Sequence, residues 1–141
     1  MTAKPVRLID AADAACYRIS AGDTVRLALV RAPDALDPSS VSFEIWDPGG
    51  AQPPNSHPQS VETFWFLRGS GIAISDGVEH PVAAGQLLVL PPGSVHRIVN
   101  TGAGRLYAIT TMSPDCGFAE LITSGLADVL DADDRAVLAG E

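Results

Sequence analysis

The sequence predicts an all-β fold with short helices at the C-terminal end. Glycine and proline are frequent, 13 and 11 of the 141 residues, and they separate short segments in which apolar and polar residues alternate. Such alternation is typical of strands with one covered face, and turn residues between the segments indicate the connections. Only the residues after Pro114 have helical spacing and helix-forming composition.

The expected strands follow from this pattern in order along the chain. They are 6–9, 17–20, 24–30, 41–47, 61–67, 72–75, 78–80, 86–90, 95–99 and 105–112. In the third of them Val25, Leu27 and Leu29 share a face, as a period of two requires. The dipeptide at 76–77, Asp-Gly, is a strong hairpin signal. The continuous apolar run at 86–90 indicates a strand covered on both faces.

The remaining segments connect or follow these strands. Residues 10–15 are expected to form a turn or one helical turn, and 31–40 a polar loop with two prolines. Residues 118–124 and 131–138, within a C-terminal segment of 117–139, are expected to be helices, with Asp131 as an N-cap. The whole chain, 1–141, is expected to be a single domain.

Composition and charge exclude several classes of partner. The formal net charge of −8 opposes binding to nucleic acid and to anionic membrane surfaces. No apolar run approaches the roughly 20 residues that a membrane-spanning helix needs, and the N-terminus has no leader-like apolar segment, so a cytoplasmic protein is expected. Cys16 and Cys116 are far apart in sequence and are expected to be reduced, buried or half-buried thiols.

Two histidine-bearing motifs lie on either side of the predicted hairpin. The first, at 49–69, reads GGAQPPNSHPQSVETFWFLRG, and the second, at 85–100, reads GQLLVLPPGSVHRIVN. They resemble the cupin motifs G-x5-H-x-H-x3,4-E-x6-G and G-x5-P-x-G-x2-H-x3-N. The second matches at every fixed position, and the first departs only at Asn55, which replaces the first histidine. The resemblance implies a cupin antiparallel β-barrel, or double-stranded jelly roll, with short C-terminal helices.

The resemblance also implies one divalent metal ion per chain, with His57, Glu62 and His96 as ligands. Two imidazoles and a carboxylate are the ligand types of non-haem Fe(II) oxygenases, so Fe(II) is the favoured metal, with Mn, Ni and Zn as alternatives. Asn55 offers only a neutral amide oxygen. Either it coordinates the metal weakly or through a water molecule, or the metal site is weakened and the fold serves as a binding pocket.

Strand parity predicts the surroundings of the metal. Glu62, Phe64 and Phe66 alternate along one strand and therefore point the same way, which predicts an apolar pocket beside the ligands. Trp46, Tyr107 and Arg68 are further pocket candidates, and core or interface packing is the alternative for the two aromatic residues. Asn100 is expected to satisfy turn backbone groups, and His80 is expected to lie on the surface.

These observations favour a metal-dependent enzyme that acts on a small polar metabolite, with dioxygenase-type oxidation as one form. A Lewis-acid isomerase or lyase is an alternative, and so is a non-catalytic binding or sensing protein with a weakened metal site. A homodimer is also expected, because Trp65 and Leu67 have the outward parity and would suit an interface between two copies.

Overall fold

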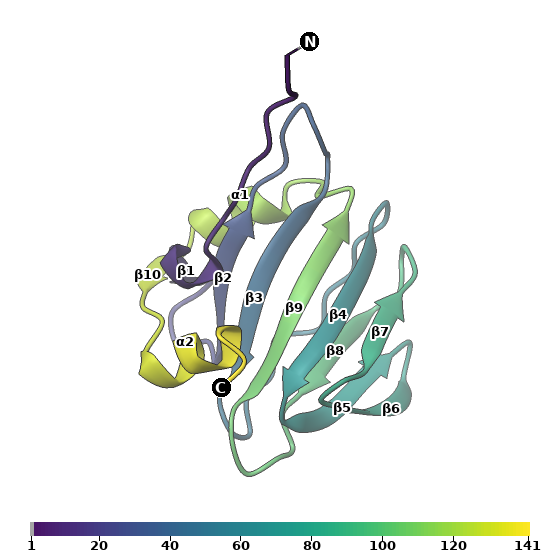
Figure 1. Cartoon of the computed structure of the whole chain (residues 1–141). Helices are drawn as coiled ribbons and strands as arrows, with labels where there is room; N and C mark the ends of the chain where they lie inside the picture. Colours follow the sequence, from purple (N-terminus) through teal and green to yellow (C-terminus); the bar gives the residue numbers. More distant parts are fainter. Residues whose placement is uncertain (1) are drawn as a thin grey trace.

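The computed structural model describes residues 2–141, in which ten strands form two antiparallel sheets (Figure 1). The larger sheet has the order β10-β1-β2-β3-β9-β4-β7 and the smaller has the order β6-β5-β8. The strands are β1 (Cys16–Arg18), β2 (Val25–Arg31), β3 (Ser40–Trp46), β4 (Val61–Arg68), β5 (Ser70–Ser75), β6 (Val78–Ala83), β7 (Leu87–Leu90), β8 (His96–Val99), β9 (Leu106–Ser113) and β10 (Leu126–Asp128). The helices are the 3-10 turn η1 (Ala11–Asp13), α1 (Phe118–Thr123) and α2 (Ala132–Leu138).

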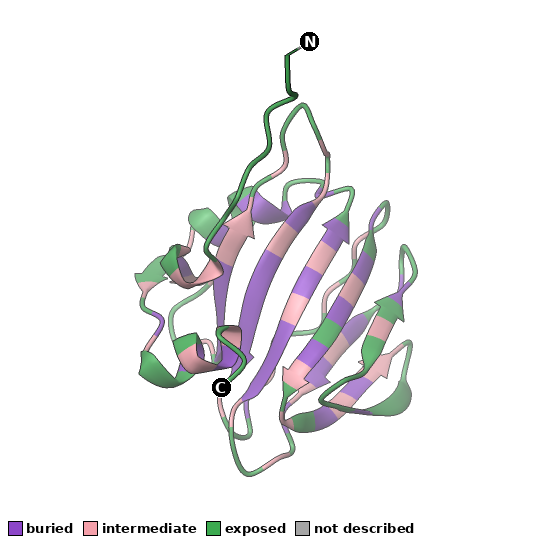
Figure 2. Ribbon diagram, in the orientation of Figure 1, coloured by how far each residue is buried: buried purple, intermediate pink, exposed green. Residues whose placement is uncertain are grey.

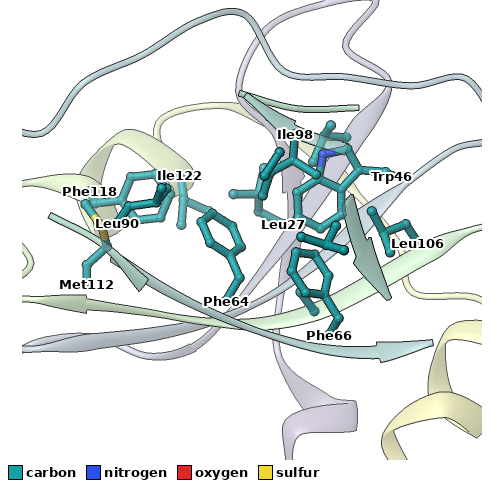
Figure 3. Packing of buried hydrophobic residues seen from close by; sticks show 14 residues of the cluster. Leu27, Trp46, Phe64, Phe66, Leu90, Ile98, Leu106, Met112, Phe118 and Ile122 are labelled. Atoms are coloured by element: carbon teal, nitrogen blue, oxygen red, sulfur yellow. The ribbon is translucent and has the colours of Figure 1, made fainter. Parts of the chain in front are cut away.

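The two sheets face each other across the main hydrophobic core. Phe64 and Phe66 of β4 stack with their ring centroids 6.1 Å apart, and Trp46 of β3 packs against Phe64 at the same distance. Ile98 of β8 closes the cluster from the smaller sheet (Figure 3). This packing confirms the expected all-β cupin barrel, because strand alternation places one apolar face of each sheet inside.

A second cluster covers the outer face of the larger sheet. Phe43 and Ile45 of β3 and Tyr107 of β9 pack there against Leu130 and Val137 from the C-terminal segment. Figure 1 shows α2 lying over this face. The Asp131 side chain accepts a hydrogen bond from the backbone N–H of Asp134, so the expected N-cap is present. The half of the larger sheet under α2 is therefore covered on both sides.

Three expectations about secondary structure were wrong. Residues 6–9 form no strand, and Leu8 is 99% exposed. The 86–90 run is not covered on both faces, because β7 lies at the end of the larger sheet to which the outer cluster does not extend, and Leu87 is 66% and Val89 60% exposed. The short strand β10, which pairs with β1, was not expected. In each case the secondary structure or the burial depends on whether a segment far away in the sequence packs or pairs there, and the local residue pattern does not contain that information.

The two cysteines and the lengths of the helices bear on the remaining expectations. Cys16 and Cys116 form no disulfide within residues 2–141, as expected; Cys16 is buried, but Cys116 is exposed rather than half-buried. Between Thr2 and Glu141, no helix combines the length and the apolar character that crossing a bilayer requires.

Candidate metal centre

The three expected metal ligands come from separate parts of the barrel. Glu62 lies on β4 in the larger sheet, His96 begins β8 in the smaller sheet, and His57 lies in the connection between β3 and β4. The His57 carbonyl accepts a hydrogen bond from the Gly93 N–H at 2.9 Å, which joins the two motif loops. Gly93 has a φ of 85°, in the left-handed region that favours glycine, and this sharp turn delivers His96 to its strand.

The fold brings the three side chains to one point. One ligand atom from each of His57, Glu62 and His96 lies within 4.8 Å of the other two. Glu62 Oε1 is 2.7 Å from His96 Nε2 and 3.8 Å from His57 Nε2. Glu62 and His96 are buried, and His57 is partly buried; burial, the larger effect, lowers the pKa of the His57 imidazole. A lowered pKa favours the neutral ring, which is the form that binds metals.

The hydrogen bond at His96 Nδ1 leaves the other ring nitrogen, Nε2, available to bind a cation. His96 Nδ1 lies 3.1 Å from the Ser94 carbonyl oxygen, which can only accept, so Nδ1 is the donor of this bond, and in a neutral ring the lone pair is then on Nε2. Among the described residues, neither His96 Nε2 nor Glu62 Oε1 has a hydrogen-bond partner of acceptable geometry. Two buried acceptor atoms that face each other without a donor suit a bound cation, so the donor set fits a divalent metal.

Asn55 lies beside this cluster. Its backbone pairs with that of His96, through N–H to carbonyl bonds of 3.0 and 2.9 Å in the two directions. The amide Nδ2 donates to the Pro53 carbonyl, whereas Oδ1 is buried and has no partner in residues 2–141. The position that carries the first histidine in the cupin motif therefore holds an available neutral oxygen.

The cluster opens into a small cavity of about 210 Å³. His57, Glu62 and Asn55 lie in its wall, and its other lining residues are mainly apolar. The lining residues are Ile19, Ser20, Asp23, Val25, Leu27, Glu44, Ala51, Gln52, Pro53, Pro54, Asn55, His57, Glu62, Phe64, Phe118 and Leu121. None of these described lining residues is lysine or arginine, so the fixed charges in the wall are acidic.

Glu44 is a cavity residue that the sequence did not single out. It is only 4% exposed, it lies on β3 between Leu27 of β2 and Ala108 of β9, and it lines the cavity. Burial and, after it, the Glu62 carboxylate raise the pKa of Glu44 to about 8. Strand parity could have identified Glu44 from the sequence. Glu44 and Trp46 are two residues apart on one strand and therefore share a face, so a buried Trp46 implies an inward-facing Glu44.

The structure separates the expected pocket residues into three groups. Phe64 lines the cavity. Phe66 and Trp46 are fully buried in the adjoining core; the Trp46 Nε1–H donates to Gln52 Oε1 at 2.7 Å and supports the cavity wall from behind. Tyr107 and Arg68 were wrong as pocket residues, because both lie on the other side of the larger sheet.

A strand irregularity explains the error for Arg68. Parity alone gives Arg68 the direction of Phe66, but the β4–β9 register shifts between these two residues. After the shift Arg68 pairs with Tyr107, whose side chain belongs to the outer cluster. The extra residue of a bulge reverses the direction of every side chain that follows. Arg68 is exposed and hydrogen-bonds the Glu141 carbonyl.

Asn100, the last residue of the second motif, and His80, which lies outside both motifs, behave as expected. Asn100 Nδ2 donates to the carbonyl oxygens of Trp46, Asp47 and Gly104, so its role is to hold the turns at the end of β8. His80 is exposed on β6, in the smaller sheet.

Comparison with known proteins assigns the family. The family described as "Cupin domain" matches residues 42–112, just over half of the chain, and this stretch includes both motifs. The chain belongs to the cupin domain family. Comparison with curated proteins gives no significant match.

Solved structures share the fold at low sequence identity. A predicted oxalate decarboxylase from Thermotoga maritima superimposes with a TM-score of 0.70 at 21% identity, covering 77% of this chain and 99% of the other. A Cupin 2 conserved barrel domain protein from Salinispora arenicola gives 0.61 at 23% identity, with coverages of 87% and 99%. An oxalate oxidase gives 0.60 at 21% identity; 69% of this chain is covered, but only 54% of the oxidase. These similarities show the fold.

Proposed function

We propose that this protein is a metal-dependent cupin enzyme that acts on a small polar metabolite, with Fe(II) as the favoured metal and dioxygenase-type oxidation as one form of the reaction. The observation that supports it most is the convergence of His57, Glu62 and His96 within 4.8 Å at the wall of a small cavity. When bound, Fe(II) supplies open positions for O₂ and substrate, whereas Mn, Ni or Zn supplies Lewis-acid polarisation of a carbonyl.

Some side chains of the site would bind the metal, and others line the cavity. His57, Glu62 and His96 would hold the ion, and the Ser94 carbonyl fixes the tautomer and orientation of His96. Asn55 Oδ1 is available as a fourth, weak oxygen donor, directly or through a water molecule. Phe64 and Phe118 line the cavity and limit the access of water to the ligands.

The main alternative is a non-catalytic cupin that binds or senses a small molecule at a weakened metal site, as the replacement of a histidine by Asn55 would favour. The Lewis-acid isomerase or lyase is a second alternative within the enzyme class. The names of two structural neighbours, oxalate oxidase and predicted oxalate decarboxylase, support the enzyme reading in general. These names do not identify the substrate of this chain, because the identities of 21% show the fold alone.

Metal analysis of the untagged protein, purified without chelator, tests the proposal. About one metal per chain is expected in the wild type, and His96→Ala should lose it, because His96 Nε2 lies 2.7 Å from Glu62 Oε1 in the ligand set. His80→Ala is the matched control, since it removes an exposed histidine outside the site and should leave the metal content unchanged.

The identity of the metal then selects the assay. Iron would direct the work to O₂ consumption, and zinc, manganese or nickel to isomerase and lyase reactions. A wild-type protein that binds none of these metals after reconstitution would contradict the metalloenzyme proposal and favour the binding protein.

We also propose that two copies associate as a homodimer through the outer faces of β4 and β7. Trp65 of β4 pairs in register with Leu87 of β7, and the two side chains are 52% and 66% exposed, with Val89 of β7 at 60%. Figure 2 shows exposed stretches of the ribbon on both strands. Leu67 is instead partly buried in the outer cluster. A symmetric contact would remove this apolar surface from water in both copies at once.

A further inference from the structure

The cavity contains one buried polar group that the metal site does not use. Glu44 lines the cavity, yet its carboxylate does not belong to the cluster whose ligand atoms lie within 4.8 Å of one another. Its Oε2 is buried and has no partner at hydrogen-bond geometry in the described part of the chain; burial raises the pKa of the Glu44 carboxyl group, and the nearby Thr110 hydroxyl, which also lacks such a partner, lowers it. Buried polar atoms are nearly always satisfied, because an unsatisfied one has lost its hydrogen bonds to water without replacement. Because Glu44 lines a cavity, a bound ligand can supply the partner of Oε2.

The surroundings of Glu44 restrict what that ligand is. Leu27 of β2 and Ala108 of β9 flank it in the sheet, and Phe64 is the aromatic wall of the same cavity. The other charged and titratable groups of the lining are Glu62, Asp23 and His57, and the described lining residues include no lysine or arginine. A bound metal would attract an anionic group to its own ligands, but a carboxylate or phosphate beside Glu44 would meet no cation there, whereas an uncharged polar group would not be repelled.

We propose that Glu44 is a substrate-contacting residue whose carboxyl group hydrogen-bonds an uncharged polar group, such as a hydroxyl, carbonyl or amide, of the small molecule in the cavity. This inference rests on the proposed function for the place of the metal beside the ligand, and it requires the part of the small polar metabolite that faces Glu44 to be uncharged.

A pair of probes with the same shape and different charge tests the proposal. Benzamide and benzoate each place an apolar ring beside one planar polar group, and binding is measured by calorimetry and ligand-observed NMR on protein freed of metal by chelation. Without metal, benzoate has no cation to bind, so the comparison reports the cavity alone. Benzamide is expected to bind metal-free wild type at least about tenfold more tightly than benzoate, because benzoate carries a negative charge and lacks the amide N–H donor.

Variants at position 44 identify the contact. Glu44→Gln keeps a planar group that donates and accepts, and should retain benzamide binding within about threefold. Glu44→Leu removes the hydrogen bond and should weaken binding about tenfold, the worth of roughly one such bond. Ser42→Ala is the matched control: it lies on the same face of β3, is buried, and is absent from the described cavity lining, so binding should not change.

The outcomes separate this inference from the proposed function. Metal content should be the same in wild type and Glu44→Leu, so a wild type that binds no metal contradicts the proposed function alone. Equal benzamide affinity in wild type and Glu44→Leu would overturn the inference and leave Glu44 a structural residue. The inference would also be overturned if folded wild type did not bind benzamide at millimolar concentration, or if it preferred benzoate. This comparison uses wild type alone, so it does not depend on whether a variant folds.

Discussion

Replacement of Asp134 by alanine is expected to cost a large part of the stability of the domain. Asp134 lies in α2 with 0% of its surface exposed. Its carboxylate accepts hydrogen bonds from Arg26 at 2.6 and 3.2 Å, from Arg105 at 3.0 Å and from the Tyr107 hydroxyl at 3.0 Å. It also accepts from the backbone N–H of Asp131, which completes the capping box of the helix.

The expected loss in the free energy of unfolding follows from the buried groups that lose their partner when Asp134 is replaced. Arg26 is 5% exposed, so Asp134→Ala leaves a buried guanidinium without its ionic partner. Breaking a buried pair in this way typically costs about 3–5 kcal/mol, out of the roughly 5–15 kcal/mol by which a domain is stable. The expected loss in the free energy of unfolding is therefore about 4 kcal/mol. Most of it should return in the double variant Arg26→Met with Asp134→Leu, because that variant leaves no unpaired charge.

Urea unfolding followed by circular dichroism measures this loss, with unchanged slopes required for the comparison. The neighbouring Asp133→Ala is the control, since Asp133 is exposed in the same helical turn and should cost less than about 1 kcal/mol. If Asp134→Ala cost no more than Asp133→Ala, the buried network would not hold α2 to the outer face of the sheet, and the reasoning from burial would be refuted.

Three further predictions concern the core, the thiols and the proposed dimer. Phe64→Ala should lower the free energy of unfolding by about 3–5 kcal/mol because the ring is 1% exposed, and a cost no larger than that of Trp65→Ala, on the opposite face of β4, would contradict this. In the folded protein a thiol reagent should label Cys116 at once and Cys16 only after unfolding, since Cys16 is buried and burial raises the pKa of its thiol. Rapid labelling of both cysteines in the folded protein would refute this prediction. Leu87→Lys should shift sedimentation from dimer to monomer without loss of metal, and a wild type that is already monomeric would disprove the dimer.

The sequence by itself determined the family and the candidate ligands. The two motifs resemble those of cupins, and this resemblance implied that His57, Glu62 and His96 meet; the structure places their ligand atoms within 4.8 Å. Strand parity also placed Phe64 inside, because side chains alternate whatever the strand pairs with. Parity is a local property that a sequence records directly, whereas the meeting of the three ligands was predicted through the family resemblance.

Only the tertiary structure decided which face of each strand is covered and by what. The apolar face of β3, with Phe43 and Ile45, lies under α2, so the opposite face carries Glu44 into the cavity. A register shift in β4 turned Arg68 outward, and the position of β7 at the sheet edge exposed Leu87. Burial, register and edge position depend on partners far away in the chain, and no local pattern of residues contains that information.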